Sequence, residues 1–204
     1  MESELRVFAV DDDPLVLRAV ERMLRSNNIG VEVFTSPAAF LDRAPYDGVA
    51  CLLLDLRMPG LSGLDVQSAM SRKGISMPIV FLSAQGDVPS TARAMREGAI
   101  DFLEKPVDEP QLLAAIERAR VQALALYEQQ RRTREAEERL ARLTKREREV
   151  CELVASGLLN KQIAYELGMS EKTVKVHRGR VTRKLEVDSV PALVRLLSSR
   201  HNQV

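Results

Sequence analysis

Five polar residues in the first half of the chain carry the side chains that phosphoryl transfer requires. They are Asp11, Asp12, Asp55, Ser83 and Lys105. Carboxylates that lie close together repel one another, and a divalent cation that prefers oxygen ligands, such as Mg²⁺, relieves this repulsion. A lysine amine balances the charge of a phosphoryl group, and a serine hydroxyl can donate a hydrogen bond to it. If folding brings these five residues together, they form a site for phosphoryl transfer.

The run "LLLDLRMPG" contains the candidate nucleophile of this site, Asp55. A carboxylate at the end of an apolar strand is costly unless it emerges at an edge or meets a partner. We expect Asp11, Asp12 and the backbone carbonyl of Arg57 to hold the metal ion. An Asp55 oxygen would then be a further ligand, placed for in-line attack on phosphorus.

A simpler interpretation applies to each of these motifs alone. Acidic residues after a strand are common helix N-caps, and Asp13 followed by Pro14 is predicted to be one. A single Lys-Pro pair, such as Lys105 and Pro106, indicates little by itself. The placement of all the polar residues after successive predicted strands favours the phosphoryl site.

Short apolar strands alternate with amphipathic helices through the first half of the chain. Strands are predicted at 6–10, 31–35, 49–54, 78–83 and 100–104, and helices at 15–25, 37–43, 63–71, 88–97 and from 108 onward. Nearly continuous apolar strands in this order predict an α/β doubly wound fold with a five-stranded parallel sheet. In such sheets the functional crevice lies outside the carboxyl ends of the strands, where the five polar residues are expected.

A long helix and a purely helical second half are predicted to follow. Residues 109–143 hold no Gly or Pro after Pro110, and their apolar seam of Ile116, Ala119, Ala123 and Leu126 fits a solvated linker or a short dimerising helix equally well. Further helices are predicted at 144–156 and 160–167, after Ser170, and at 191–198. The turn from Gly168 to Ser170 between two short helices is typical of a helix-turn-helix.

The helix after Ser170 is strongly basic. Between positions 172 and 184 there is no acidic residue, and the six basic residues are Lys172, Lys175, Arg178, Arg180, Arg183 and Lys184. A solvated helix usually mixes both signs of charge. After the predicted turn, this segment is expected to be a recognition helix for the major groove of DNA, with Val174, Val181 and Leu185 on its apolar face.

Composition sets the broad class. A chain of 204 residues with 45% hydrophobic residues can bury two modest cores. Residues 1–120 hold 13 Lys and Arg against 18 Asp and Glu, whereas residues 121–204 hold 17 against 11, so only the second half suits a polyanion. No signal peptide or membrane span is recognisable, and a soluble, cytoplasmic protein is expected. Cys51 and Cys151 match no metal or redox spacing and are expected to be buried.

Residues 1 to about 122 resemble a response-regulator receiver domain. The segments "VFAVDDDP", "LLLDLRMPG", "FLSAQGDVP" and "DFLEKPV" match its characteristic segments in order. The resemblance implies a flavodoxin-like fold in which Asp55 accepts phosphate from a sensor histidine kinase and Asp11 and Asp12 bind Mg²⁺. It also implies a cis peptide bond between Lys105 and Pro106, and a switch pair formed by Ser83 and Phe102.

The segment 143–187 resembles the LuxR-type helix-turn-helix, and the whole chain is most similar to the FixJ group within the NarL/FixJ family. The resemblance implies a receiver at 1–122, a helical linker at 123–142 and a DNA-binding domain at 143–204. The residues expected to face DNA are Lys172, Thr173, Lys175, Val176, His177, Arg178, Arg180 and Lys184. Partners implied are promoter DNA, a second copy of the chain bound through the phosphorylated receiver, and RNA polymerase.

One residue departs from the family pattern. Gly179 stands inside the recognition helix where relatives usually carry a polar residue, and glycine costs about 1 kcal/mol there relative to alanine. It removes a side-chain contact and permits a closer approach of the backbone. The DNA sequence read by this chain therefore cannot be copied from its relatives.

Two other classes of function fit parts of the sequence. A phosphatase with an aspartyl nucleophile is one, but dehalogenase-like phosphatases place a second Asp two residues after the nucleophile, and this chain has Arg57 there. An adaptor whose helical domain binds protein is the other. The sequence favours a two-component transcription factor over both, and we expect no enzyme that turns over a substrate.

Overall fold

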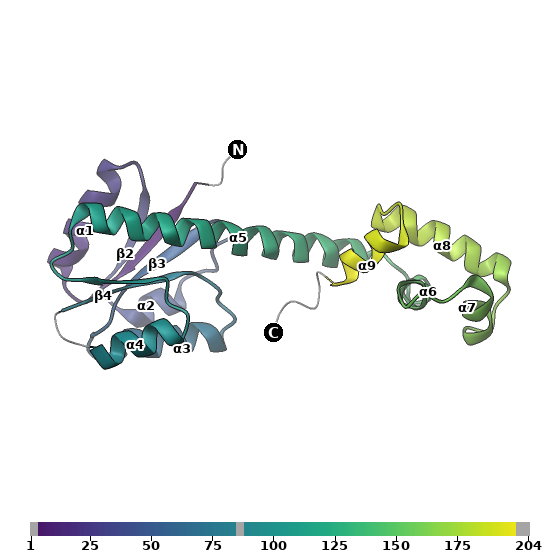
Figure 1. Ribbon diagram of the computed structural model, residues 1–204, viewed down its shortest axis with the longest axis horizontal. Helices are drawn as coiled ribbons and strands as arrows, with labels where there is room; N and C mark the ends of the chain where they lie inside the picture. The colour runs from purple at the N-terminus through teal and green to yellow at the C-terminus, as the bar shows by residue number, and fades with distance from the viewer. Residues whose placement is uncertain (1–3, 85–87, 199–204) are drawn as a thin grey trace. The chain divides into compact units, whose positions relative to one another are not determined.

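The computed structural model describes residues 4–84 and 88–198. The chain divides into two compact units, residues 1–127 and 128–204, and each is described by itself (Figure 1). The segment at 85–87, which belongs to the motif "FLSAQGDVP", lies outside the described residues. Within the described residues, no helix combines the length and the apolar character needed to cross a membrane.

The N-terminal unit is built on a parallel sheet of five strands. They are β1 (Arg6–Val10), β2 (Gly30–Phe34), β3 (Ala50–Asp55), β4 (Ile79–Ser83) and β5 (Asp101–Glu104). The strand order is β2-β1-β3-β4-β5, with every neighbouring pair parallel. The doubly wound fold and all five predicted strands are confirmed. This strand order reverses between β1 and β3, and such a switch point is where open α/β sheets bind ligands.

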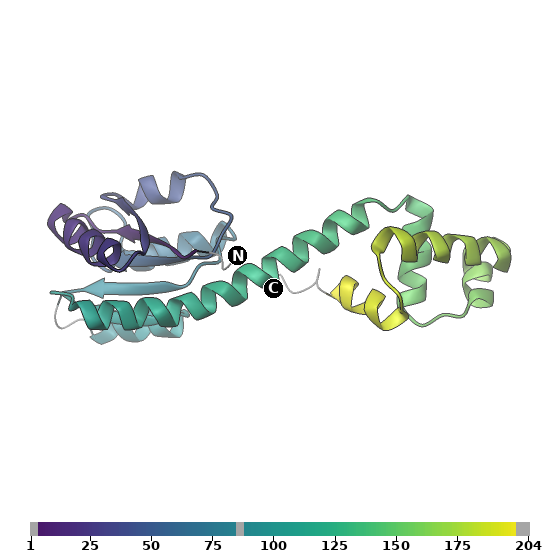
Figure 2. The same cartoon turned by 90° about the horizontal axis from the view of Figure 1, so that it is seen from above.

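Helices cover both faces of the sheet (Figure 1, Figure 2). They are α1 (Pro14–Ser26), α2 (Pro37–Asp42), α3 (Gly63–Arg72), α4 (Val88–Arg96) and α5 (Glu109–Ala141). Residues of α1 and α5 share one hydrophobic core with one face of the sheet, and residues of α2, α3 and α4 share a second core with the other face.

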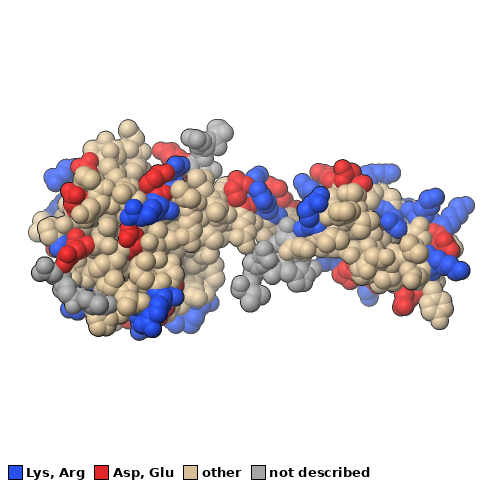
Figure 3. All heavy atoms as spheres, in the orientation of Figure 1, with Lys and Arg blue, Asp and Glu red and all other residues tan. Residues whose placement is uncertain are grey.

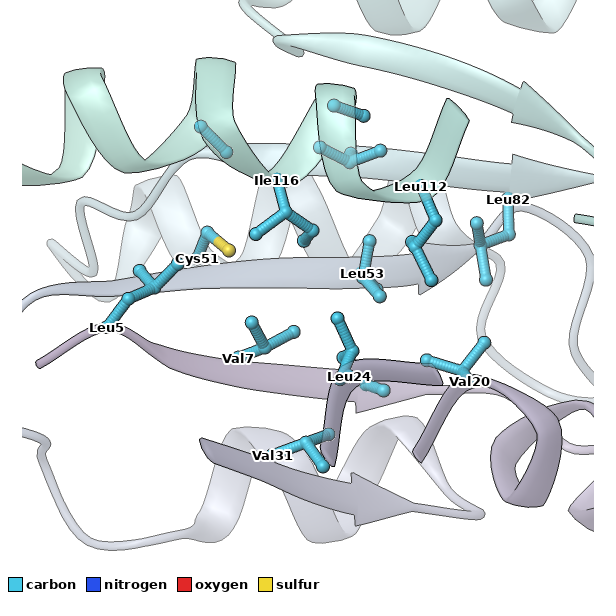
Figure 4. Packing of buried hydrophobic residues seen from close by; sticks show 14 of the residues in the cluster. Leu5, Val7, Val20, Leu24, Val31, Cys51, Leu53, Leu82, Leu112 and Ile116 are labelled. Carbon is cyan, nitrogen blue, oxygen red and sulfur yellow. The ribbon is translucent and has the colours of Figure 1, made fainter. Parts of the chain in front are cut away.

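The central strand β3 supplies both of these cores. Cys51 and Leu53 point into the core beneath α1 and α5 (Figure 4), whereas Leu52 and Leu54 belong to the opposite core. All six residues of β3 are buried. A strand buried on both faces must be apolar throughout, which explains the continuous run before Asp55. Cys51 is buried, as predicted.

Helix caps follow the sequence with one exception. The Asp13 side chain caps α1 by accepting a hydrogen bond from the Leu15 backbone N–H at 2.8 Å, with Pro14 in the first turn, as predicted. Ser36 occupies the N-cap position of α2, but its side chain makes no capping hydrogen bond. Pro37, which needs no N–H partner in the first turn, begins the helix.

Up to residue 198, the C-terminal unit contains four helices in addition to the end of α5. They are α6 (Lys145–Ala155), α7 (Asn160–Glu166), α8 (Glu171–Leu185) and α9 (Val190–Ser198). Its core includes Cys151, Ile163, Val174 and Val181. Gly168 adopts a φ of 61° in the turn between α7 and α8, a conformation that glycine takes without steric cost. The predicted helix-turn-helix is confirmed.

The two ends of α5 belong to different cores. Ile116, Ala119 and Ala123 are buried in the core of the N-terminal unit, so most of the predicted apolar seam packs on the sheet. Leu140 is buried in the core of the C-terminal unit. The division between the units falls within the predicted linker, at residues 127 and 128. The helix ends at Ala141 rather than at residue 143.

Candidate functional site

Strand register brings the predicted acidic residues together. Val10 pairs with Leu54, so Asp11, the residue after β1, lies beside Asp55 at the end of β3. Asp11 is 1% exposed and Asp55 is 3% exposed, whereas Asp12 is open to solvent. One carboxylate oxygen of each of the three residues lies within 4.8 Å of the others. The convergence that was expected from parallel topology is therefore present at the switch point.

Lys105 follows the edge strand β5, and its side chain reaches this cluster. Ser83 pairs with Glu104, and the Lys105 backbone N–H donates a hydrogen bond to the Ser83 carbonyl at 2.7 Å. The Lys105 Nζ lies 2.6 Å from Asp11 Oδ2 and 2.7 Å from Asp55 Oδ1. The peptide bond between Lys105 and Pro106 is cis, as the resemblance implied.

The site holds more negative than positive charge. Burial raises the pKa of the Asp55 carboxyl, and the hydrogen bond from Lys105 opposes this shift without cancelling it. Burial lowers the pKa of the Lys105 amine, but its hydrogen bonds to Asp11 and Asp55 outweigh burial and raise the pKa. One ammonium group contacts two of three clustered carboxylates. These hard oxygen donors fit Mg²⁺, because a divalent cation would supply the missing charge.

The predicted switch residues lie on β4 and β5. Ser83 is 1% exposed, and its hydroxyl donates a hydrogen bond to the Ala84 carbonyl at 2.9 Å. Phe102 is partly buried and packs against the core beneath α2, α3 and α4. Arg57 lies two residues after Asp55 in the loop that leads to α3. The Ser83 hydroxyl and the Phe102 ring are thus both within the unit that holds Asp55, on adjacent strands.

Gly63 supports the site and was not foreseen from the sequence. A Cβ at this position would lie 2.4 Å from the backbone oxygen of Asp55 and 2.9 Å from the ring of Phe81. Only glycine lets the start of α3 approach the end of β3 this closely. The Gly63 N–H also donates to the Leu56 carbonyl at 3.0 Å. The available signal was a glycine at the first position of a predicted helix.

The recognition helix α8 exposes only part of its basic side chains. Of the residues predicted to face DNA, those open to solvent are Lys172, Thr173, Lys175, Val176 and Arg180. His177, Arg178 and Lys184 are partly buried. On the face drawn in Figure 3, Lys and Arg side chains gather at the end of the C-terminal unit that α7 and α8 form. Arg183, absent from the predicted set of DNA contacts, is exposed as well.

Two of the partly buried cations are bound inside the unit. Arg178 donates a hydrogen bond to Asn160 Oδ1 of α7 at 2.6 Å. The Lys184 Nζ lies 2.6 Å from Glu147 Oε2 and donates to the Arg142 carbonyl at 3.1 Å. We therefore assign Lys184 to the support of α8. This role could not be predicted from the sequence, because the partner Glu147 is distant from Lys184 along the chain.

Glu147 is a buried carboxylate with several hydrogen bonds. It is 3% exposed, and it also accepts a hydrogen bond from the Thr144 backbone N–H at 2.9 Å, completing a capping box at the start of α6. The hydrogen bond from Lys184, followed by that from Thr144, lowers the pKa of Glu147 from 4.5 to about 2. The sequence signal for the cap was Thr144 with Glu147 three residues later.

Comparisons with known proteins agree with both units. Residues 7–117 match the response regulator receiver domain, and residues 141–197 match the bacterial regulatory proteins of the luxR family. The chain is 44% identical over 194 residues to the response regulator protein TodT of Pseudomonas putida, covering 93% of this chain and 84% of TodT. It is 39% identical over 196 residues to the transcriptional regulatory protein FixJ of Azorhizobium caulinodans, covering 96% and 93% of the two chains.

Solved structures show the same relationship. The response regulator StyR matches with a TM-score of 0.80 and 42% identity, covering 96% of this chain and 99% of StyR. Full-length FixJ from B. japonicum matches with a TM-score of 0.57 and 35% identity, covering 98% of each chain. TodT and StyR are response regulators, and FixJ is a transcriptional regulatory protein. The chain therefore belongs to the NarL/FixJ family, in which a receiver is joined to a LuxR-type helix-turn-helix, and it is a DNA-binding transcriptional response regulator of a two-component system.

Proposed function

We propose that Asp55 is the phosphoacceptor of this regulator and that a sensor histidine kinase supplies the phosphoryl group. The observation that carries the proposal is the contact of the Lys105 amine with both Asp11 and Asp55 in a cluster of three carboxylates. An Asp55 oxygen attacks phosphorus in line, the bond from phosphorus to the kinase imidazole breaks, and an acyl phosphate forms. The Lys105 ammonium then pairs with a phosphoryl oxygen.

Asp11, Asp12, Asp55 and the backbone carbonyl of Arg57 are the proposed ligands of Mg²⁺. When bound, the ion neutralises charge on the phosphoryl oxygens and on the carboxylates, which is the main requirement of phosphoryl transfer. Asp11 is already oriented, because its Oδ1 accepts a hydrogen bond from the Asp13 backbone N–H at 2.9 Å. Asp12 is the solvent-exposed member of the proposed ligand set.

The proposed switch couples the acyl phosphate to the surface of the receiver. The Ser83 hydroxyl leaves the Ala84 carbonyl and donates to a phosphoryl oxygen. Phe102, on the neighbouring strand, turns inward into the space that this movement opens. The receiver surface around α4 and β5 changes, and two phosphorylated copies of the chain associate through it.

The homodimer presents two α8 helices to promoter DNA in the cytoplasm, with RNA polymerase as a further partner. The receiver is assigned to 1–122, the linker to 123–142 and the DNA-binding domain to 143–204. The DNA-facing residues in this proposal are Lys172, Thr173, Lys175, Val176, His177, Arg178 and Arg180. Lys184 contributes by holding α8 against α6.

Replacing Asp12 with asparagine tests the metal site. We expect the Mg²⁺ concentration for half-maximal phosphorylation by acetyl phosphate to rise at least tenfold or so, because one anionic ligand is lost. Intact-protein mass spectrometry measures the attached phosphate across a Mg²⁺ titration. Asp13→Asn is the matched control, since asparagine also caps a helix and should leave the titration unchanged. An unchanged titration for Asp12→Asn would contradict the proposed ligand set.

Salt dependence tests the proposed DNA face. Affinity for promoter DNA should fall steeply with salt, because the basic side chains displace counterions from phosphates. Lys175→Ala should reduce the slope of log affinity against log salt by about one per α8 helix bound. Lys184→Met should leave the slope at its wild-type value, since its amine is bound to Glu147. Fluorescence anisotropy at several salt concentrations measures both slopes, and equal slopes for wild type and Lys175→Ala would count against this face.

A further inference from the structure

One row of residues forms the outermost ridge of α8. Lys172, Val176, Gly179 and Arg183 follow one another at intervals of four, three and four residues, so they lie on one face of the helix. All four are exposed, and the buried residues Val174, Val181 and Leu185 lie on the opposite face. Because helix-turn-helix proteins place this helix in the major groove, the row faces the edges of the bases.

Gly179 leaves a gap in the middle of this row. Apart from its two chain neighbours and the backbone of its own helix, a Cβ built at this position would meet no atom within 4 Å, and this holds for the side chains on either side along the row. Gly179 is not among the glycines with a positive φ, so the backbone does not require glycine here. Glycine is also unfavourable within a helix. Neither packing nor backbone conformation within the C-terminal unit requires glycine at position 179. A contact with a partner outside the chain would account for it.

The residue that precedes Gly179 in the row is apolar. Val176 is 48% exposed. The two residues at the ends of the row, Lys172 and Arg183, are charged. Among the groups that base pairs present in the major groove, the apolar one is the 5-methyl group of thymine. The missing side chain at Gly179 and the exposed apolar side chain of Val176 next to it in the row suit contact with a methyl group, and neither side chain offers a hydrogen bond.

We infer that Gly179 is a specificity determinant of this regulator. The gap between Val176 and Arg183 accepts the 5-methyl group of one thymine in each half-site, and this base pair is read by contact with Val176 and with the bare backbone at Gly179. Lys172 and Arg183, at the two ends of the row, make the charged contacts that hold the helix in register. The inference rests on the DNA-binding role of the helix-turn-helix and adds the base that it prefers.

Uracil substitution tests the inference, because uracil differs from thymine only by the missing methyl group. Full-length wild-type protein first selects a duplex from a random library, and each thymine of that parent duplex is then replaced in turn. At one thymine per half-site we expect affinity to fall about fourfold, the effect of one buried methyl group. The other thymines serve as internal controls and should change affinity little.

Gly179→Ala fills the gap with a methyl group of its own. The variant should be at least as stable to heat as the wild type, since alanine favours the helix. It should bind the parent duplex more weakly, and its ratio of thymine to uracil affinity at the sensitive position should fall to near one. Arg180→Ala, a charged contact outside the row, should weaken both duplexes alike and keep the wild-type ratio.

Two results would overturn the inference while leaving the DNA-binding role intact. One is a uracil scan in which the wild type binds the parent duplex and no replacement of thymine by uracil lowers its affinity. The other is a wild-type ratio retained by Gly179→Ala. Failure of the wild-type chain to select any duplex would instead overturn the DNA-binding role on which the inference rests.

Discussion

Asp55→Asn is expected to abolish both phosphorylation by acetyl phosphate and the gain in promoter affinity that follows it. Asparagine has nearly the same shape as aspartate, but its amide is not a nucleophile that can form an acyl phosphate. Without that bond the Ser83 hydroxyl has no phosphoryl oxygen to engage. For the wild type we expect phosphorylation to tighten promoter binding tenfold or so, because a dimer binds two half-sites together.

Mass spectrometry and fluorescence anisotropy on the same samples measure these two effects. Asp42→Asn is a suitable control, because Asp42 is an exposed carboxylate whose side chain is 80% accessible at the end of α2. It should be phosphorylated and should bind DNA as the wild type does. Phosphate incorporation by Asp55→Asn at the wild-type rate would exclude Asp55 as the acceptor. Equal promoter affinity of wild type with and without phosphate would contradict the switch.

Lys184→Met is expected to destabilise the C-terminal unit by about 2 kcal/mol, because it leaves the buried Glu147 carboxylate without its charged hydrogen-bond donor. A residue that only contacted DNA would give almost no change in stability. The exposed neighbour Arg183 provides the comparison, and Arg183→Met should change stability by less than about 0.5 kcal/mol. Hydrogen exchange of amides in α6 and α8 of the full chain measures the free energy of unfolding of this unit.

The same ion pair predicts a dependence of stability on pH. The pKa of Glu147 is lowered in the folded chain from 4.5 to about 2, so folding favours its ionised form. Its contribution to stability is therefore complete above pH 4.5 and is lost as the pH falls toward 2. Lys184→Met should weaken this acid dependence, and Glu147→Gln should remove it. Equal acid dependence in wild type and Glu147→Gln would contradict the assignment.

The elements and the convergence of the candidate site residues were predictable because their signals are local or topological. Apolar runs mark the strands, and Asp13 with Pro14 marks the start of α1. Parallel topology alone places residues that follow strands at one edge of the sheet. For this reason Asp11, Asp55 and Lys105 could be brought together from the sequence although many residues separate them.

The roles of individual basic residues in α8 were less predictable. A count of charges between positions 172 and 184 does not distinguish a lysine that faces solvent from one that pairs with a buried glutamate on another helix. Val181 and Leu185, which lie close to Lys184 in the sequence, are on the apolar face of the helix. Their position indicates that this lysine lies near the buried side. Its partner Glu147 lies 37 residues away, and only the folded chain identifies it.

The burial of β3 on both faces has a consequence for how the strand finds its alignment. A half-buried strand is aligned by its alternating pattern, because a slip of one residue would turn its apolar side to water. In β3 the residues from Cys51 to Leu54 are apolar on both sides, so a slip would exchange one apolar face for the other. The charge at Asp55 breaks this degeneracy, since drawing it inward would bury a carboxylate away from Lys105. The proposed phosphoacceptor thus also marks where the strand must stop during folding.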